Sequence, residues 1–179
     1  MTLDAGDFLL AEPSERYAEQ IRAYRQDFLD TGCSMDGCGP IRRCADPIEY
    51  IAECRKYTAP ETLPEGKVIA TQFFYIRKAD DRLVGMIQIR HYLNEYLARF
   101  GGHIGYSVRP SERRKGCAAS MLHAVLPYCR ELGLEKILIT CNDGNIGSEK
   151  TILHNGGVYE STVYEPDEAV NLKRFWITL

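Results

Sequence analysis

Between residues 103 and 131 the sequence passes from a strand pattern to a helix pattern through one short basic turn. His103–Val108 is typical of a strand, and Pro110 ends it because proline cannot continue a β-ladder. Glu112–Glu131 repeats apolar residues at helical spacing, which predicts a long helix. The basic turn Arg113–Gly116 lies where that helix begins, so the sequence predicts a strand–turn–helix unit.

The chemistry of this turn suits a phosphate group. A helix N-terminus presents N–H groups without partners and a partial positive charge. Gly116 lets a ligand approach the backbone closely, and the small residues Cys117, Ala118 and Ala119 keep the approach clear. The pattern G-x-x-x-x-G-K-[ST] of a nucleotide-binding P-loop is absent. A solvated basic helix start is the alternative reading of the same residues.

The rest of the chain predicts a mixture of strands and helices. The expected strands are 7–11, 68–76, 83–89, 136–140, 158–164 and 172–179, and the further helices are 15–29, 47–56, 92–100 and 145–154. Loops rich in glycine or proline are expected at 31–40 and 58–66. Hairpins followed by a β-α-β-α order and further strands predict an α/β fold, with a mixed sheet and helices on both of its faces.

Length and charge exclude several classes of protein. The 179 residues suffice for one domain but not for two independent ones. The net charge of −3 gives no general attraction to nucleic acid or to an anionic membrane. The first seven residues lack the basic and apolar segments of a signal peptide, so we expect a cytoplasmic protein.

The number and spacing of the seven cysteines predict free thiols rather than a disulfide framework. Cys33, Cys38, Cys44 and Cys54 fall in one stretch, but their spacing lacks the tight pairs typical of zinc sites. An odd count without a secretion signal argues against disulfides. We expect no metal; a redox or metal protein built on this stretch is a minor alternative.

The turn and its surroundings resemble the GNAT superfamily of acyl-CoA-dependent N-acyltransferases. Residues 113–118, Arg-Arg-Lys-Gly-Cys-Ala, match the family signature [RQ]-x-x-G-x-[GA]. Ile104–Pro110 is similar to the fourth strand of that family, and Ile137–Thr140 to its fifth. Asn145–Ser148 resembles the N-x-x-[AS] opening of the next helix, which would end at Gly156 and Gly157. The resemblance covers most of the chain and is weakest in the first 60 residues.

The resemblance implies a fold and a CoA site. It implies one domain over residues 1–179, with a central, mostly antiparallel sheet of about seven strands flanked by helices on both faces and a CoA-binding core at about 101–157. The backbone N–H groups of the turn would hold the CoA pyrophosphate. The backbone at Val108 and Arg109 would pair with the pantetheine arm, which Asn145 would meet from the other side of a splayed strand pair. The implied cofactor-binding residues are Val108, Arg109, Arg113, Arg114, Lys115, Gly116, Cys117, Ala118, Ala119 and Asn145. Lys150 is a candidate contact of an adenosine phosphate, and a surface lysine without that role is the alternative.

The catalytic groups are less defined by the resemblance. Many members carry a tyrosine that acts as the general acid seven residues after the asparagine that opens the helix. In this chain that asparagine is Asn145 and the position is Ile152, which cannot donate a proton. Tyr159 and Tyr164 are candidate substitutes. His103, near where several relatives have a glutamate, is the candidate base because a neutral imidazole accepts a proton near pH 7. A structural role for His103 is the alternative, and His91 is a weaker candidate.

The sequence therefore predicts an N-acetyltransferase that passes an acetyl group from acetyl-CoA to a primary amine by direct attack in a ternary complex. Cys117 and Cys141 lack an evident histidine partner, which disfavours a covalent intermediate. A non-catalytic acyl-CoA-binding module and a transferase of longer acyl groups are the alternatives. The acceptor is an amine on a small molecule or a peptide, and Arg90 is a candidate for binding an acidic group of it. A homodimer through strands at 158–179 is an open alternative.

Overall fold

A computed structural model describes all residues from 1 to 179. In chain order the elements are β1 (Thr2–Ala5), β2 (Phe8–Ala11), η1 (Glu15–Tyr17), α1 (Ala18–Thr31), η2 (Gly39–Arg42), α2 (Pro47–Arg55), η3 (Pro60–Thr62), β3 (Ala70–Arg77), β4 (Arg82–Arg90), η4 (Leu97–Gly101), β5 (Ile104–Val108), η5 (Pro110–Glu112), α3 (Cys117–Glu131), β6 (Lys136–Asn142), α4 (Ile146–His154), β7 (Val158–Glu165) and β8 (Val170–Thr178). None of the helices is both long and apolar enough to cross a membrane.

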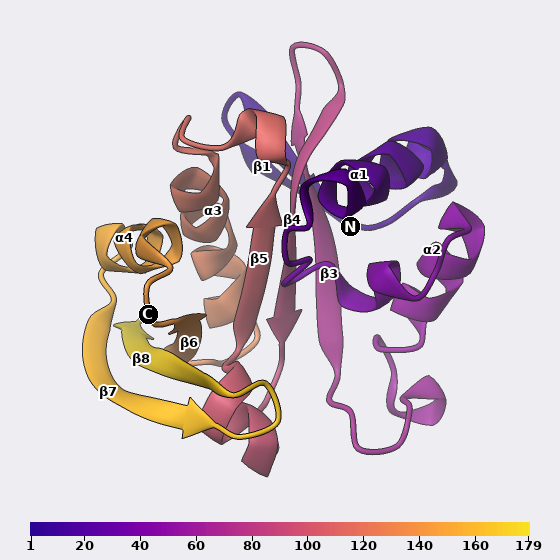
Figure 1. The fold of residues 1–179 in the computed structure, drawn as a ribbon. Helices are drawn as coiled ribbons and strands as arrows, with labels where there is room; N and C mark the ends of the chain where they lie inside the picture. The colour runs from indigo at the N-terminus through magenta and orange to yellow at the C-terminus, as the bar shows by residue number, and fades with distance from the viewer.

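The strands form two antiparallel sheets (Figure 1). One has the order β1-β2-β3-β4-β5 and the other the order β6-β8-β7. The predicted fold class is confirmed, since helices flank a mostly antiparallel strand arrangement on both faces. The difference is that the strands are divided between two sheets, and that β8 lies in the middle of its sheet rather than at an edge.

Helices cover both faces because side chains on β3 alternate between two cores. Phe73 and Tyr75 pack in the core that contains α3, whereas Phe74 and Ile76 pack in the core beneath α1 and α2. All four side chains are fully buried. A strand with both faces covered has no polar side, which explains the unbroken apolar run of this segment.

A pair of hydrogen bonds joins the two sheets next to His103. The backbone N–H of His103 donates to the Leu138 carbonyl at 2.7 Å, and the Leu138 N–H donates to His103 Nδ1 at 2.9 Å. Gly102 precedes this contact with a φ of +65°, and a Cβ there would lie 2.5 Å from the Leu138 carbonyl oxygen. Only glycine allows this approach. Beyond the contact no ladder joins β5 to β6, so the strands separate.

Several predicted boundaries are wrong. Helix α3 begins at Cys117 rather than Glu112, because the 3-10 turn η5 comes first and Arg114 and Gly116 both have positive φ. The helix expected over 92–100 is mostly the short π-helix η4. Strand β1 was not expected; it pairs only with β2, at the outer edge of its sheet.

Candidate active site

A cavity of about 750 Å³ occupies the region where β5 and β6 separate. The N-terminus of α3 lines one part of it, and β5, β6 and the start of α4 line the middle. The π-helix η4 and the β7–β8 turn line another part. The cavity therefore joins the basic turn of the sequence to elements that are distant from it along the chain.

The N-terminus of α3 opens onto this cavity without a cap. Gly116 is the N-cap residue and offers no side chain, so the N–H groups of Cys117, Ala118 and Ala119 have no partner within the helix. A Cβ built on Gly116 meets nothing within 4 Å, which shows open space in front of the helix. Arg113 and Arg114 line the same region. These groups fit an anionic ligand such as the pyrophosphate of CoA.

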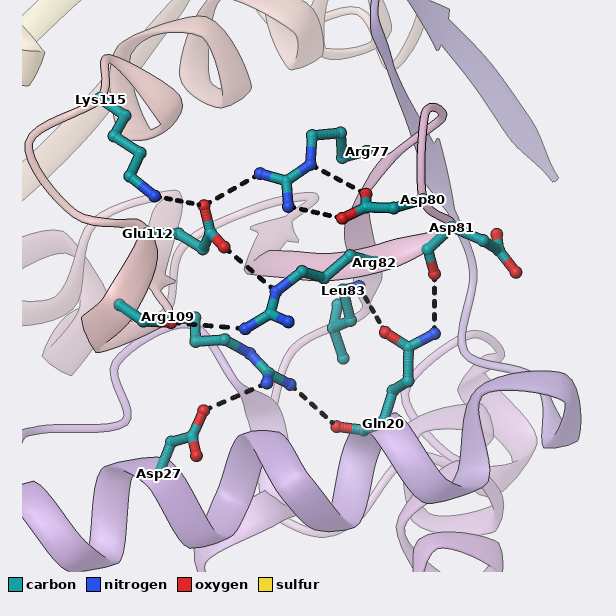
Figure 2. Close-up of polar contacts among 11 residues, drawn as sticks. Gln20, Asp27, Arg77, Asp80, Asp81, Arg82, Leu83, Arg109, Glu112 and Lys115 are labelled. Carbon is teal, nitrogen blue, oxygen red and sulfur yellow. Dashed lines mark hydrogen bonds and ion pairs between the residues drawn. The ribbon is translucent and has the colours of Figure 1, made fainter.

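A buried carboxylate anchors this turn from behind (Figure 2). The Glu112 carboxylate forms ion pairs with Arg77 at 2.9 Å, with Lys115 at 3.0 Å and with Arg82 at 3.1 Å. Lys115 is committed to this cluster and does not line the cavity. The structure thus uses its side chain to hold the turn, whereas the sequence placed it among the phosphate-binding residues.

The Arg109 side chain also points away from the cavity. It reaches α1, where it pairs with Asp27 at 3.2 Å and donates to the Gln20 carbonyl at 3.4 Å. Its guanidinium lies over the ring of Tyr24. Burial lowers the pKa of Arg109, with Asp27 acting against that effect. Arg109 therefore joins the end of β5 to α1.

The end of β5 is held by further polar contacts. Arg113 Nε donates to the Val108 carbonyl at 3.1 Å. The Tyr24 hydroxyl donates to the Ser107 carbonyl at 3.1 Å, and Cys38 Sγ lies 2.8 Å from the Ser107 hydroxyl. Both Ser107 and Val108 line the cavity, so the strand that would face the pantetheine arm is fixed by α1 and the loop after it.

Two residues of the α4 start line the opposite wall. Asn145 caps the helix, its Oδ1 accepting from the Ser148 N–H at 3.1 Å. The Ser148 hydroxyl lies 2.8 Å from the Tyr106 hydroxyl. Burial raises the pKa of Tyr106 to about 12, so this phenol stays protonated at neutral pH. Ile152 lies one turn after Ser148 and is fully buried in the core.

The part of the cavity near η4 is acidic. Asp36, Glu165 and Glu168 line it. Glu165 is only 2% exposed; its Oε2 accepts from the Glu168 N–H at 2.6 Å, and its Oε1 has no hydrogen-bond partner. A buried carboxylate oxygen without a partner carries an uncompensated desolvation cost. Glu165 was missed in the sequence, where nothing distinguishes it from the other acidic residues.

The structure does not bring the two predicted catalytic residues to this cavity. His103 is buried where the sheets touch, and burial together with the charge of Arg90 lowers its pKa to about 4. Its Nδ1 is already an acceptor for the Leu138 N–H. Tyr159 is half-exposed on β7, with its hydroxyl 2.9 Å from that of Thr162. Neither residue lines the cavity.

The cysteines are all free, and no group of His, Cys, Asp and Glu side chains is placed to hold a metal ion. Burial raises the pKa of Cys38 and of Cys54 to about 12. Burial also raises the pKa of Cys117 and of Cys141, two of the three thiols that line the cavity. Deprotonation of these four thiols is therefore disfavoured at neutral pH. Cys33 is the third thiol of the lining, and hydrogen bonds with Thr31 and with Arg113 lower its pKa.

Solved structures of acetyltransferases share this fold. A GNAT-family acetyltransferase from Bacillus anthracis is 19% identical, with 99% of this chain and 98% of that chain covered and a TM-score of 0.67. The microcin C7 self-immunity acetyltransferase MccE, solved with acetyl-CoA and AMP, is 18% identical over 98% of this chain and 94% of its own, with a TM-score of 0.71. The ribosomal L7/L12 α-N-protein acetyltransferase RimL, solved with coenzyme A, is 11% identical over 100% of this chain and 98% of its own, with a TM-score of 0.73. At these identities the likeness establishes the fold.

The sequence also matches a family directly. No curated protein matches it, but the family model described as "Acetyltransferase (GNAT) domain" matches residues 40–158, well over half of the chain. The matched segment contains β5, the basic turn, α3, β6 and α4, which together form most of the cavity. The chain therefore belongs to the GNAT family of acetyltransferases and is an acyltransferase.

Proposed function

We propose that the chain transfers the acetyl group of acetyl-CoA to a primary amine by direct attack in a ternary complex. The observation that carries this proposal is one cavity that contains both an uncapped helix N-terminus and a buried carboxylate with a free oxygen. The first suits the pyrophosphate of CoA, and the second suits an amine that must lose a proton. The solved relatives MccE and RimL, whose structures contain acetyl-CoA and coenzyme A respectively, support the choice of donor.

The donor would lie along the separated strands. The N–H groups of Cys117, Ala118 and Ala119 would bind the pyrophosphate, and Arg113 and Arg114 would add positive charge. The backbone at Val108 would face the pantetheine arm, with Asn145 on the opposite wall. Acetyl-CoA supplies an acetyl thioester, whose carbonyl carbon accepts the amine nitrogen while the C–S bond breaks and sulfur keeps the electron pair.

Two side chains in the cavity can move the protons that this reaction requires. Glu165 would take the proton from the ammonium form of the acceptor, because its Oε1 is buried and has no other partner. Ser148 would pass a proton from Tyr106, whose hydroxyl lies 2.8 Å away, to the leaving sulfur, and the second proton that the acceptor nitrogen loses would return to Tyr106 through solvent. Ser148 thereby replaces the tyrosine expected at position 152, where the helix turns its side chain into the core.

A covalent thiol intermediate receives no support from the geometry. Cys117 lies at the phosphate-binding end of α3, and Cys141 is buried on β6. Burial raises the pKa of both thiols, and no histidine lines the cavity. A cysteine nucleophile requires a lowered pKa or a neighbouring base. Cys33 has a lowered pKa, but its hydrogen bond with Arg113 holds it at the phosphate-binding end of the cavity. We therefore take the amine itself as the attacking group.

The test measures release of the CoA thiol from acetyl-CoA with a panel of amines, together with the mass of the acetylated product. We expect Glu165→Gln to lower kcat/KM by about 10²-fold or more, as loss of a general base does. Ser148→Ala should lower kcat and leave acetyl-CoA binding intact. Glu131→Gln, an exposed carboxylate far from the cavity on α3, is the matched control. Full activity of Glu165→Gln would show that Glu165 is not the general base. Absence of thiol release with every amine would contradict the proposed reaction.

We further propose a cytoplasmic location and a homodimer. The strand β7 lies at the edge of its sheet, and its side chains Val158, Tyr159 and Tyr164 are exposed. An edge strand with exposed apolar residues is available for pairing with a second copy. Sedimentation velocity of the wild type beside a Val158→Lys variant tests the dimer, which the substitution should dissociate.

A further inference from the structure

A second cavity, of about 530 Å³, adjoins the proposed active site and has a different charge. It lies among η2, the loop before β3, the end of β4 and the segment before η4. Arg90, Tyr96 and Leu97 line both cavities, so these three side chains form the wall between them. Its volume is within the range of small-molecule sites, about 300–1,000 Å³.

The lining of this second cavity is basic and contains no carboxylate. Its charged residues are Arg43, Lys67 and Arg90. Lys67 is exposed and makes no ion pair, and Arg43 reaches only Glu53, at 3.6 Å. The lining also offers the side chains of Gln88 and Tyr57. The cavity therefore presents a net positive charge that the protein itself leaves largely uncompensated.

Arg90 is the most constrained of these cations. One of its terminal nitrogens donates to the carbonyls of Gly101 and Gly102, both at 2.8 Å, which fixes the guanidinium at the wall between the cavities. No ion pair joins Arg90 to a carboxylate; Asp36 is the carboxylate whose charge acts on it, and its hydrogen bonds go to carbonyl groups. A largely buried guanidinium bonded only to neutral groups gains from an anionic ligand, and its planar fork suits a carboxylate or a phosphate.

The charges of the two cavities define the acceptor. On one side of Arg90 lie Asp36, Glu165 and Glu168, which attract an ammonium group; on the other side lie Arg43 and Lys67. We propose that the acceptor is a small amine that carries a carboxylate or phosphate group, with its amine beside Glu165 and its anionic group in the basic cavity. This inference rests on the proposed acetyl transfer and adds the chemical class of the substrate.

The arrangement also excludes acceptors. A polyamine or another polycation would place its second positive charge beside Lys67 and Arg90, which repel it. A neutral amine would leave Arg90 without an anionic partner. Selection by charge therefore favours compounds of opposite charge at their two ends, such as amino acids and aminoalkyl phosphates.

The experiment compares matched pairs of acceptors in the thiol-release assay. The pairs are an amino acid and its amide, β-alanine and β-alaninamide, and phosphoethanolamine and ethanolamine. The amine of each amide is the less basic one and is more fully deprotonated near neutral pH, so amine chemistry alone favours the amide. We expect kcat/KM to favour an anionic member over its neutral partner by about tenfold or more. The preference for the anionic member in the first two pairs, compared with that in the third pair, shows whether a carboxylate or a phosphate is the preferred anion.

A charge reversal in the basic cavity tests the cause of that preference. Lys67→Glu should reduce the ratio of kcat/KM between the anionic and neutral members to near one, mainly through KM. Arg130→Glu, an exposed arginine of α3 without an ion pair, is the matched control and should keep the ratio. The inference is wrong if neutral or cationic amines are preferred, or if Lys67→Glu leaves the ratio unchanged. If no amine of the panel causes thiol release, the proposed acetyl transfer, on which the inference rests, is itself wrong.

Discussion

Replacement of Glu112 by glutamine should loosen the turn that begins at Arg113. The Glu112 carboxylate lies within 3.1 Å of Arg77, Arg82 and Lys115, and its side chain is only 6% exposed. Glutamine keeps the shape and leaves three cations without their shared partner. Breaking a buried pair costs about 3–5 kcal/mol and an exposed one about 0–1 kcal/mol. Because Glu112 is buried and its partners are partly exposed, we expect the free energy of unfolding to fall by about 2 kcal/mol, or about 4–8 °C in Tm.

Urea unfolding between pH 7 and pH 3 measures this effect and its origin. Hydrogen bonding to Arg77 and to Lys115 holds the pKa of Glu112 below its ordinary value of 4.5. A lowered pKa means that the stabilisation is complete above pH 4.5 and is lost as the pH falls through the pKa of the folded state. The deficit of Glu112→Gln should therefore shrink toward pH 3. Glu135→Gln removes an exposed carboxylate that makes no ion pair, and should stay within about 0.5 kcal/mol of the wild type. A Glu112→Gln protein as stable as the wild type at pH 7, or a deficit independent of pH, would refute the reasoning.

Three further outcomes follow from the side chains placed outside the cavity. The His103 ring should titrate near pH 4 by NMR, because burial keeps it neutral in the folded state. Its contribution to stability is then complete above pH 6.5 and is lost as the pH falls toward 4, and urea unfolding of His103→Asn should show a weaker pH dependence than the wild type. Tyr159→Phe should keep the rate of thiol release within about twofold, since its hydroxyl meets only Thr162; a large loss would return Tyr159 to the catalytic machinery. Cys38→Ser should change thiol release little, whereas an inactive and well-folded variant would contradict the structural role of this buried thiol.

Local patterns predicted the elements around the basic turn well, because each of them carries its own signal. Proline ended β5, glycine marked the start of α3, and the Asn145 cap marked the start of α4. The start of α3 was placed too early because Glu112 is a good helix former, and no composition signal reveals the positive φ of Arg114. Backbone angles of single residues are set by the contacts that the turn makes, which the sequence does not show.

The predicted site residues that line the cavity come from two short motifs, around the basic turn and at the start of α4. The proposed phosphate-binding residues follow one another along the chain, so a motif could indicate them. Glu165 is the last residue of β7 and meets the cavity only because β7, β8 and β6 pair in that order. The basic cavity is likewise assembled from the separate segments that contain Arg43, Lys67 and Arg90. His103 was misplaced for the same reason, since its contact with Leu138 depends on how the two sheets meet.

Thermal unfolding with and without acetyl-CoA tests most directly that the uncapped start of α3 is a CoA site. At a ligand concentration of about 100 times Kd, binding stabilises the folded state by about 2.7 kcal/mol. For a chain of this size we expect Tm to rise by about 5–10 °C. Gly116→Glu places a carboxylate at the mouth of the helix, where the space in front of Gly116 is open, and should abolish the shift. No shift in the folded wild type, or an equal shift in the variant, would contradict the account.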